Sequence, residues 1–103
     1  MLLYNVTTIV DESIAQEWQE WMLSKHIPDV MNTGLFVKNH FLKVLDSPNE
    51  GVTYSAQFIA KSKDDYELYL EKHATELREE VKALFKEQLV SFRTLMEYVT
   101  DDF

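Results

Sequence analysis

The sequence predicts an α+β sandwich in which a four-stranded antiparallel sheet is covered on one face by two helices. Four segments are rich in β-branched and aromatic residues and alternate in polarity, while two longer segments repeat apolar residues at helical spacing. They follow one another as strand, helix, strand, strand, helix, strand. The chain has 103 residues with two glycines and two prolines, so we expect one domain over residues 1–103 with few long loops.

The first part of the chain is predicted to form a strand, "LLYNVTTIV", followed by a helix. Asp11 stands where an N-cap residue would, and Glu12 lies in the first turn, where the helix dipole favours negative charge. The apolar face of this helix is formed by Ile14, Trp18, Trp21 and Met22. Because Pro28 disfavours the helical conformation at the residue before it, we expect the helix to end near Lys25 or His26.

The second and third strands are predicted at 35–45 and 52–61, joined by the hairpin signal "DSPNEG". Ser62 opens an S-x-x-D capping motif for a second helix over about 62–86. Its apolar stripe consists of Tyr66, Tyr69, Leu70, His73, Leu77, Val81, Leu84 and Phe85. A last strand is expected at 89–99. This order is the β-α-β-β-α-β pattern of the ferredoxin-like sandwich, with both helices on one face of the sheet.

The face of the sheet without helices is predicted to be mixed in polarity, whereas a solvent-facing sheet alternates more sharply. A mixed face suits a homodimer in which two sheets stack and enclose a pocket for a small organic molecule. The residues proposed to line this pocket are Asn5, Trp21, His40, Gln57, Arg93 and Glu97. Arg93 and Glu97 lie four residues apart on one strand and are also expected to pair with each other. The alternative is an open sheet without a partner.

The composition argues against several classes of partner. A net charge of −8 disfavours binding to nucleic acid and to anionic membrane surfaces. No apolar run approaches the ~20 residues of a membrane span, and the N-terminal segment is typical of a strand rather than of a signal peptide. We therefore expect a soluble cytoplasmic protein. The chain has no cysteine, which excludes disulfides and thiolate chemistry.

Four segments carry a resemblance to a known family: "YNVT", "EWxxWM", "HIPDVMNTGLF" and "FRTLMEYV". On the basis of these segments, essentially the whole chain resembles the uncharacterised family called domain of unknown function 4286. That family name implies no particular activity.

More broadly, Trp21, His26, Pro28 and Gly34 resemble a motif of the dimeric α/β-barrel superfamily, which includes small-molecule monooxygenases, lactone isomerases and haem-degrading enzymes. In some of those relatives the histidine borders the barrel cavity, which implies a role for His26 in ligand binding or proton transfer. In the haem-degrading branch, the loose counterparts are Asn5 and His73. The tryptophan that accompanies them has no counterpart, and no cofactor is expected.

His26 is the candidate catalytic residue, because an imidazole can give or take a proton near neutral pH. A position at a helix C-terminus would favour its charged form, and Asp29 could orient it. The alternative is a histidine that caps its own helix. The three histidines lie on separate elements without metal-binding spacing, so we expect no metal site.

Two functions remain open from the sequence. One is a small-molecule-binding protein or cofactor-independent enzyme, similar to a monooxygenase or an isomerase. The other is a non-catalytic homodimeric module in which the open sheet face serves as the subunit interface.

Overall fold

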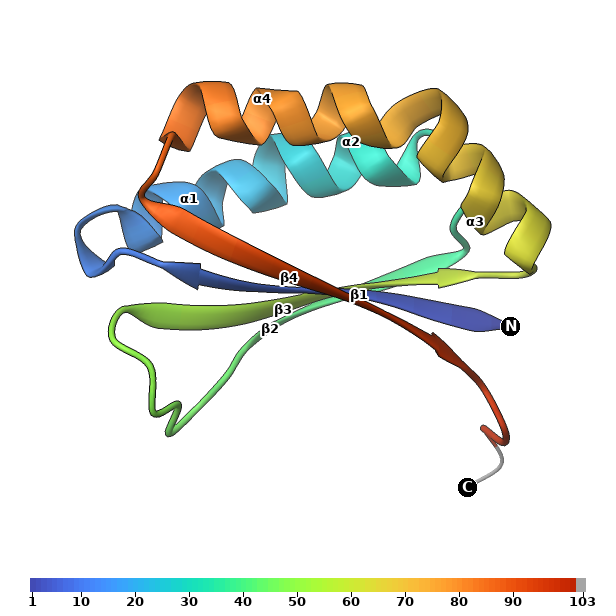
Figure 1. The fold of residues 1–103 in the computed structure, drawn as a ribbon, viewed down its shortest axis with the longest axis horizontal. Coiled ribbons are helices and arrows are strands. Elements are labelled where there is room, and N and C mark those ends of the chain that lie inside the picture. Colours follow the sequence, from blue (N-terminus) through green and yellow to red (C-terminus); the bar gives the residue numbers. More distant parts are fainter. Residues whose placement is uncertain (102–103) are drawn as a thin grey trace.

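The computed structural model describes residues 1–101 and has two layers, an antiparallel sheet and a helical layer on one of its faces (Figure 1). The strand order across the sheet is β2-β3-β1-β4. The bounds of the strands are β1 Leu2–Val10, β2 Lys38–Lys43, β3 Val52–Ala60 and β4 Leu89–Glu97. This topology confirms the predicted ferredoxin-like fold.

The first helical segment is continuous over four parts: η1 Glu12–Ile14, α1 Ala15–Trp21, η2 Met22–His26 and α2 Ile27–Met31. The predicted end near Lys25 or His26 is therefore wrong. The part η2 is a π turn in which the Ile27 N–H donates to the Met22 carbonyl, five residues back. Pro28 comes two residues after this π turn, in the first turn of α2, where the wider turn changes the regular i→i−4 pattern that a proline cannot complete.

The second helical segment consists of α3 Lys63–Tyr69, η3 Leu70–Ala74 and α4 Thr75–Phe85. The Ser62 hydroxyl accepts a hydrogen bond from the Asp65 N–H at 3.2 Å, which confirms the predicted cap. The part η3 is again a π turn. The buried residues Tyr69 and Ala74 are five residues apart across it, and α-helical spacing resumes afterwards. Leu84, predicted to face the core, is 55% exposed instead.

The strand register divides the sheet into a covered face, which carries the even-numbered residues of β1 and β3, and an open face, which carries their odd-numbered residues. In β4 the odd-numbered residues belong to the covered face, because Val6 pairs with Arg93 and Asn5 with Thr94. Arg93 and Glu97 therefore lie on the covered face. Asn5, His40 and Gln57 lie on the open face. The prediction that all five share one face is wrong.

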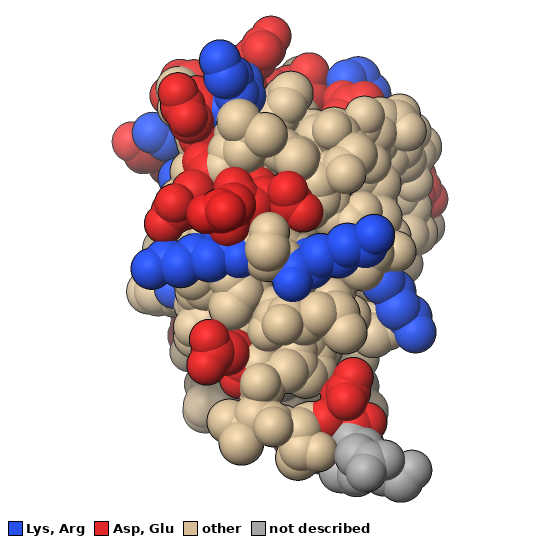
Figure 2. Space-filling model, turned by 90° about the vertical axis from the view of Figure 1, so that its right-hand side faces the viewer, with Lys and Arg blue, Asp and Glu red and all other residues tan. Residues whose placement is uncertain are grey.

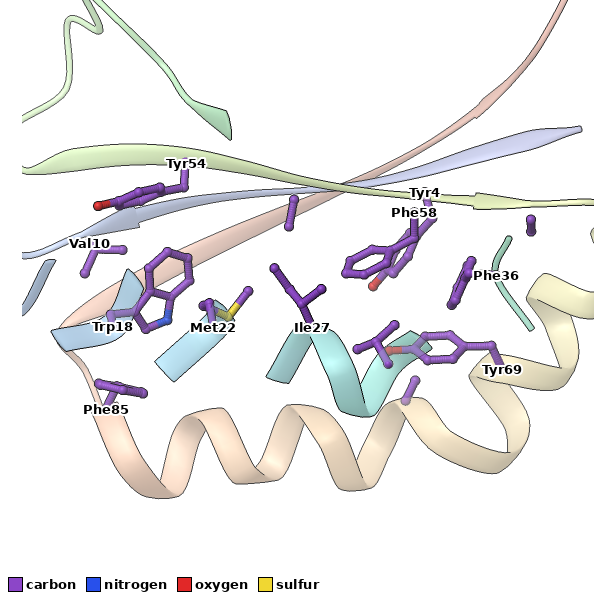
Figure 3. Packing of buried hydrophobic residues seen from close by; sticks show 14 of the residues in the cluster. Tyr4, Val10, Trp18, Met22, Ile27, Phe36, Tyr54, Phe58, Tyr69 and Phe85 are labelled. Atoms are coloured by element: carbon purple, nitrogen blue, oxygen red, sulfur yellow. The ribbon is translucent and has the colours of Figure 1, made fainter. Parts of the chain in front are cut away.

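Aromatic side chains fill much of the space between the two layers (Figure 3). The Tyr4 ring lies with its centroid 6.2 Å from Phe36, 6.3 Å from Phe58 and 6.0 Å from Tyr69. At the other end of the core Trp18 packs on Tyr54 at 4.9 Å. Such pairs contribute about 0.5–1.5 kcal/mol each beyond the burial of apolar area, so they fix the separation of helices and sheet.

The connection into β2 is longer than predicted. Gly34 has φ = +79°, the left-handed conformation that favours glycine, and it forms the turn after the first helical segment. Residues 35–37 then precede the strand, although the Val37 N–H already donates to the Ile59 carbonyl at 2.8 Å. In the described part of the chain, no helix has the length and apolarity needed to cross a membrane.

Candidate functional site

A cavity of ≈ 580 Å³ lies between the covered face of the sheet and the helical layer. Residues of β1 and β4 form its floor, α4 forms its roof, and the first helical segment closes one side. Apolar side chains contribute much of the wall, among them Met22, Val30, Phe58 and Tyr69. The cavity thus belongs to one chain and lies on the opposite side of the sheet from the predicted inter-sheet pocket.

The π turn η2 places His26 in the wall of this cavity. A π turn holds one more residue than an α-helical turn, so it rotates the side chains around it relative to a regular helix. The imidazole stacks on the Trp21 ring, with centroids 5.2 Å apart and an interplanar angle of 29°. Trp21 also packs edge-on against Phe85 at 5.3 Å. Trp21 therefore supports His26 without lining the cavity itself.

Burial lowers the pKa of His26 below its ordinary value of 6.5, and this effect outweighs the carboxylates of Glu80 and Asp29, which raise it. The expected stabilisation of the charged form is wrong, because His26 lies inside a continuous helical segment and not at its C-terminus. Its Nδ1 atom is buried and has no hydrogen-bond partner among the described residues. At neutral pH the side chain is an uncharged imidazole that can accept a proton.

Two guanidinium groups meet at the hydroxyl of Tyr4 on the cavity floor. The Tyr4 oxygen accepts from Arg78 Nη2 at 3.0 Å and from Arg93 Nε at 3.2 Å. A phenol oxygen accepts two hydrogen bonds, so both lone pairs are used. The Nε atom of Arg78 is buried without a partner within residues 1–101. A buried donor without a partner is costly, and Arg78 lines the cavity.

Other polar groups surround this pair of guanidinium groups. The hydroxyls of Thr8 and Ser91 bond each other across the strands at 2.9 Å. Lys82 and Lys86 also line the cavity, whereas Glu79 is the one carboxylate among the described lining residues. The site therefore combines an apolar wall, a neutral imidazole and a strongly cationic end.

Three of the predicted pocket residues lie in one row on the open face. His40 pairs with Gln57 and Gln57 with Asn5, across β2, β3 and β1. Ser55 links two of them, because its hydroxyl donates to Asn5 Oδ1 at 2.6 Å and accepts from Gln57 Nε2 at 3.3 Å. This row is separated from His26 and Arg93 by the sheet itself.

The remaining expectations for the polar candidates differ from what the structure shows. Asp29 pairs with Lys25 instead of orienting His26. Among residues 1–101 no ion pair joins Arg93 to Glu97, since Arg93 bonds Tyr4, so that pairing is wrong.

His73 lines a second, more open hollow of ≈ 340 Å³ between the helical segments. The structure does not bring it to Asn5, which lies on the open face of the sheet. The two loose counterparts of the haem-degrading residues, Asn5 and His73, therefore lie on different sides of the sheet. Within the described chain, no group of three or more histidine or carboxylate residues is arranged to hold a metal ion.

Sequence reasoning missed Tyr4 and Arg78. Arg78 stands in a run of charged residues, a pattern typical of a solvated helix surface. The signal that could have found it is its spacing: it lies four residues after the buried Ala74 and seven before the buried Phe85, which places it on the inward face of α4. Tyr4 belongs to the aromatic core, and only the structure shows that its hydroxyl reaches two arginines.

Comparison with solved structures finds the same fold in proteins of low sequence identity. SnoaB, a cofactor-independent oxygenase from Streptomyces nogalater, has a TM-score of 0.69 at 15% identity, covering 96% of this chain and 94% of that chain. The haem-degrader MhuD from Mycobacterium tuberculosis has a TM-score of 0.71 at 12% identity, covering 100% of both chains. A dimeric ferredoxin-like protein from an uncultured marine organism has 0.71 at 16% identity, covering 100% of this chain and 99% of that chain.

These similarities establish the fold. No curated protein matches the chain in sequence. The family model described as Domain of unknown function (DUF4286) matches residues 1–99. The chain belongs to this family.

Proposed function

We propose that the protein is a homodimer in which each subunit binds a small organic molecule between its sheet and its helices, with His26 as a proton acceptor. The observation that carries this proposal is the uncharged imidazole in the wall of the ≈ 580 Å³ cavity, with its Nδ1 atom unpartnered among the described residues. A buried polar atom without a partner is uncommon and calls for an explanation. A bound ligand supplies one.

The cavity has the size and the wall of a ligand site. Pockets for small molecules measure about 300–1,000 Å³ and combine mostly apolar walls with a few polar groups. Here Met22, Val30 and Phe58 offer the apolar surface, while His26 stands among them. A titratable group with a shifted pKa in such a cavity is a candidate for chemistry.

The chemistry that this arrangement supports is proton transfer. A ligand C–H or O–H bond breaks, the proton passes to the imidazole of His26, and the electron pair stays on the ligand as an enolate or alkoxide. The imidazolium that forms is stabilised by the nearby carboxylate of Glu80, which raises the pKa of His26. Return of the proton to another atom of the ligand completes an isomerisation without any further reactant.

The homodimer is supported by the open face of the sheet. Val90, Phe92 and Met96 of β4 and Leu42 of β2 are large apolar side chains that are exposed on this face. Exposed apolar patches of this kind mark interaction surfaces. We assign the patch to a second copy of the chain because one structure of the same fold is described as a dimeric ferredoxin-like protein. A cytoplasmic location is also part of the proposal, and the cysteine-free composition supports it.

The non-catalytic module is the second candidate, and one observation favours it. The open-face row around Ser55 is already satisfied by its own hydrogen bonds, as expected of a closed interface. In that case the open face would mediate dimerisation and the cavity would hold no ligand.

The three histidines provide the test, because each lies in a different environment. We would titrate the protein with indole and with 1-naphthol, two neutral aromatic probes, and follow the imidazole signals of His26, His40 and His73 by NMR. We expect saturable shifts at His26, with little change at the other two histidines, and loss of binding when Val81→Trp, at a half-buried lining position, narrows the cavity. Shifts confined to His40 would place the ligand between the sheets. If no histidine signal shifts up to the solubility limit of the probes, the protein would be the non-catalytic module.

A further inference from the structure

We infer that the natural ligand carries a carboxylate, which is held between Arg78 and Arg93 at the Tyr4 hydroxyl while its apolar body lies along the wall of the cavity. This inference rests on the proposed function and names the chemical class of its ligand.

The geometry at Tyr4 resembles an anion site that holds a neutral oxygen. Both guanidinium groups donate to the same phenol oxygen, so their bonded nitrogens lie no more than about 6 Å apart. Two like charges this close repel each other; water screens part of this repulsion because Arg93 is exposed, and an anion between the two groups would neutralise it. Among residues 1–101 no carboxylate pairs with either arginine, so the protein itself does not neutralise them.

Free donors remain for such an anion. Arg78 Nε is buried and unpartnered in the described structure. Because the two arginines occupy both lone pairs of the Tyr4 oxygen, the proton of this hydroxyl is also available to a ligand. A planar carboxylate with two acceptor oxygens matches the planar guanidinium, which explains why arginine is preferred wherever carboxylates are recognised.

The cavity lining is cationic, although the chain as a whole is acidic. The lining includes Arg78, Lys82, Lys86 and Arg93 but, in the described part, one carboxylate, Glu79. The whole chain has 10 Lys and Arg against 18 Asp and Glu. On an outer end of the molecule the basic groups form a band that directly borders acidic ones (Figure 2). Cations gathered without matching acids in a cavity raise the local concentration of an anionic ligand.

The proposed proton transfer to His26 also requires positive charge near the ligand. Abstraction of a proton by His26 leaves negative charge on the ligand, and Arg93 lines the same cavity as His26. A preorganised cation near developing charge stabilises it more than the neutral ground state. A carboxylate therefore fixes the ligand, and the same arginines stabilise the charge that forms beside it.

The test compares benzoate with benzamide, which share a shape and differ in charge. Binding is followed through the Nε–H signals of Arg78 and Arg93 and the imidazole signals of His26 in NMR titrations of the full chain. We expect benzoate to bind at least tenfold more tightly than benzamide and to shift both arginine signals. Arg78→Gln should weaken benzoate at least tenfold and change benzamide less than twofold, and Arg78→Lys should recover part of the loss.

Lys72→Gln is the matched control, since it also removes one positive charge from the second helical segment but at an exposed position outside the cavity. Its benzoate affinity should stay within twofold of the wild-type value. Arg93→Gln, on the edge strand β4, gives an independent variant if Arg78→Gln does not fold. Equal affinities for benzoate and benzamide, or benzoate binding without shifts at the arginines, would overturn the inference. So would the absence of benzoate binding while indole and 1-naphthol still shift His26, an outcome that leaves the proposed function intact.

Discussion

Between Val90 and Arg93, the two faces of β4 are the reverse of what a sheet beneath a helical layer usually presents, whereas Leu89 and Leu95 keep apolar side chains on the covered face. On the covered face, where apolar residues are normally buried, β4 carries Ser91 and Arg93. On the open face, where polar residues normally meet water, it carries Val90 and Phe92. Antiparallel sheets with one solvated face usually show the opposite pattern.

This inversion shows that the strand serves two surfaces at once. Polar residues that face inwards would be costly in a filled core, but they suit a cavity that accepts a polar ligand. Apolar residues that face outwards would be costly in water, but they suit a subunit interface. The difference between the faces therefore assigns the ligand to the covered side and the second subunit to the open side.

The largest expected effect concerns the open face. Phe92→Glu places a charge in the proposed dimer interface, and we expect the dissociation constant to rise by at least about 100-fold, because buried aromatic anchors contribute most of the binding energy at interfaces. Sedimentation or light scattering at micromolar concentration measures it. Leu84→Glu is the matched control: Phe92 is 56% exposed and Leu84 is 55% exposed, but Leu84 lies on α4 in the helical layer. If both variants stay dimeric, the open face is not the interface.

A smaller effect is expected on the covered face. Tyr4→Phe removes the oxygen that accepts from two charged donors, and we expect the free energy of unfolding to fall by about 2 kcal/mol. Tyr54→Phe is the comparison, because the Tyr54 hydroxyl donates to the neutral Gln19 Oε1 at 2.9 Å and should cost about 1 kcal/mol. Urea denaturation measures both. A Tyr4→Phe protein as stable as the wild type would show that the two arginines gain nothing from this hydroxyl.

The smallest effect is the pH dependence caused by His26. Its pKa is lower in the folded protein than its ordinary value of 6.5, so below that pH the unfolded chain binds more protons. The stability that His26 contributes is therefore present above pH 6.5 and is lost as the pH falls through the folded pKa. His26→Gln should unfold with a weaker pH dependence between about pH 7 and 5. A steeper dependence in this variant would contradict a buried neutral imidazole, and the NMR titration of His26 should have its midpoint below 6.5.

The elements of the fold were predictable because their signals are local. Alternation identified the strands, and Ser62 marked the start of the second helix. The two π turns that interrupt the helical segments were not predictable. A proline normally ends a helix, but the π turn at Met22–His26 lets the chain pass Pro28. Nothing in the composition of that stretch distinguishes a π turn from an α-helical end.

The candidate site was only partly predictable, because it depends on which way each strand faces. His26 was singled out by its motif and lines the cavity, whereas Arg93 was named for a pocket on the open face and lines the cavity on the covered face instead. The alternation of β4 was assigned to the wrong faces, since apolar residues were expected to point to the helices. Arg78 could not be distinguished from the other charged residues of its helix. It reaches the site only because α4 packs over β1, where Arg78 donates to the Tyr4 hydroxyl.

A crystal structure of the protein grown with benzoate tests the division between the two faces most directly. We expect two chains packed with their open faces together and Phe92 buried between them. In each chain, the benzoate carboxylate should lie between Arg78 and Arg93, on the other side of the sheet. Benzoate between the two sheets beside His40 and Gln57, or an open face left in solvent, would contradict this assignment of ligand and subunit interface to opposite faces.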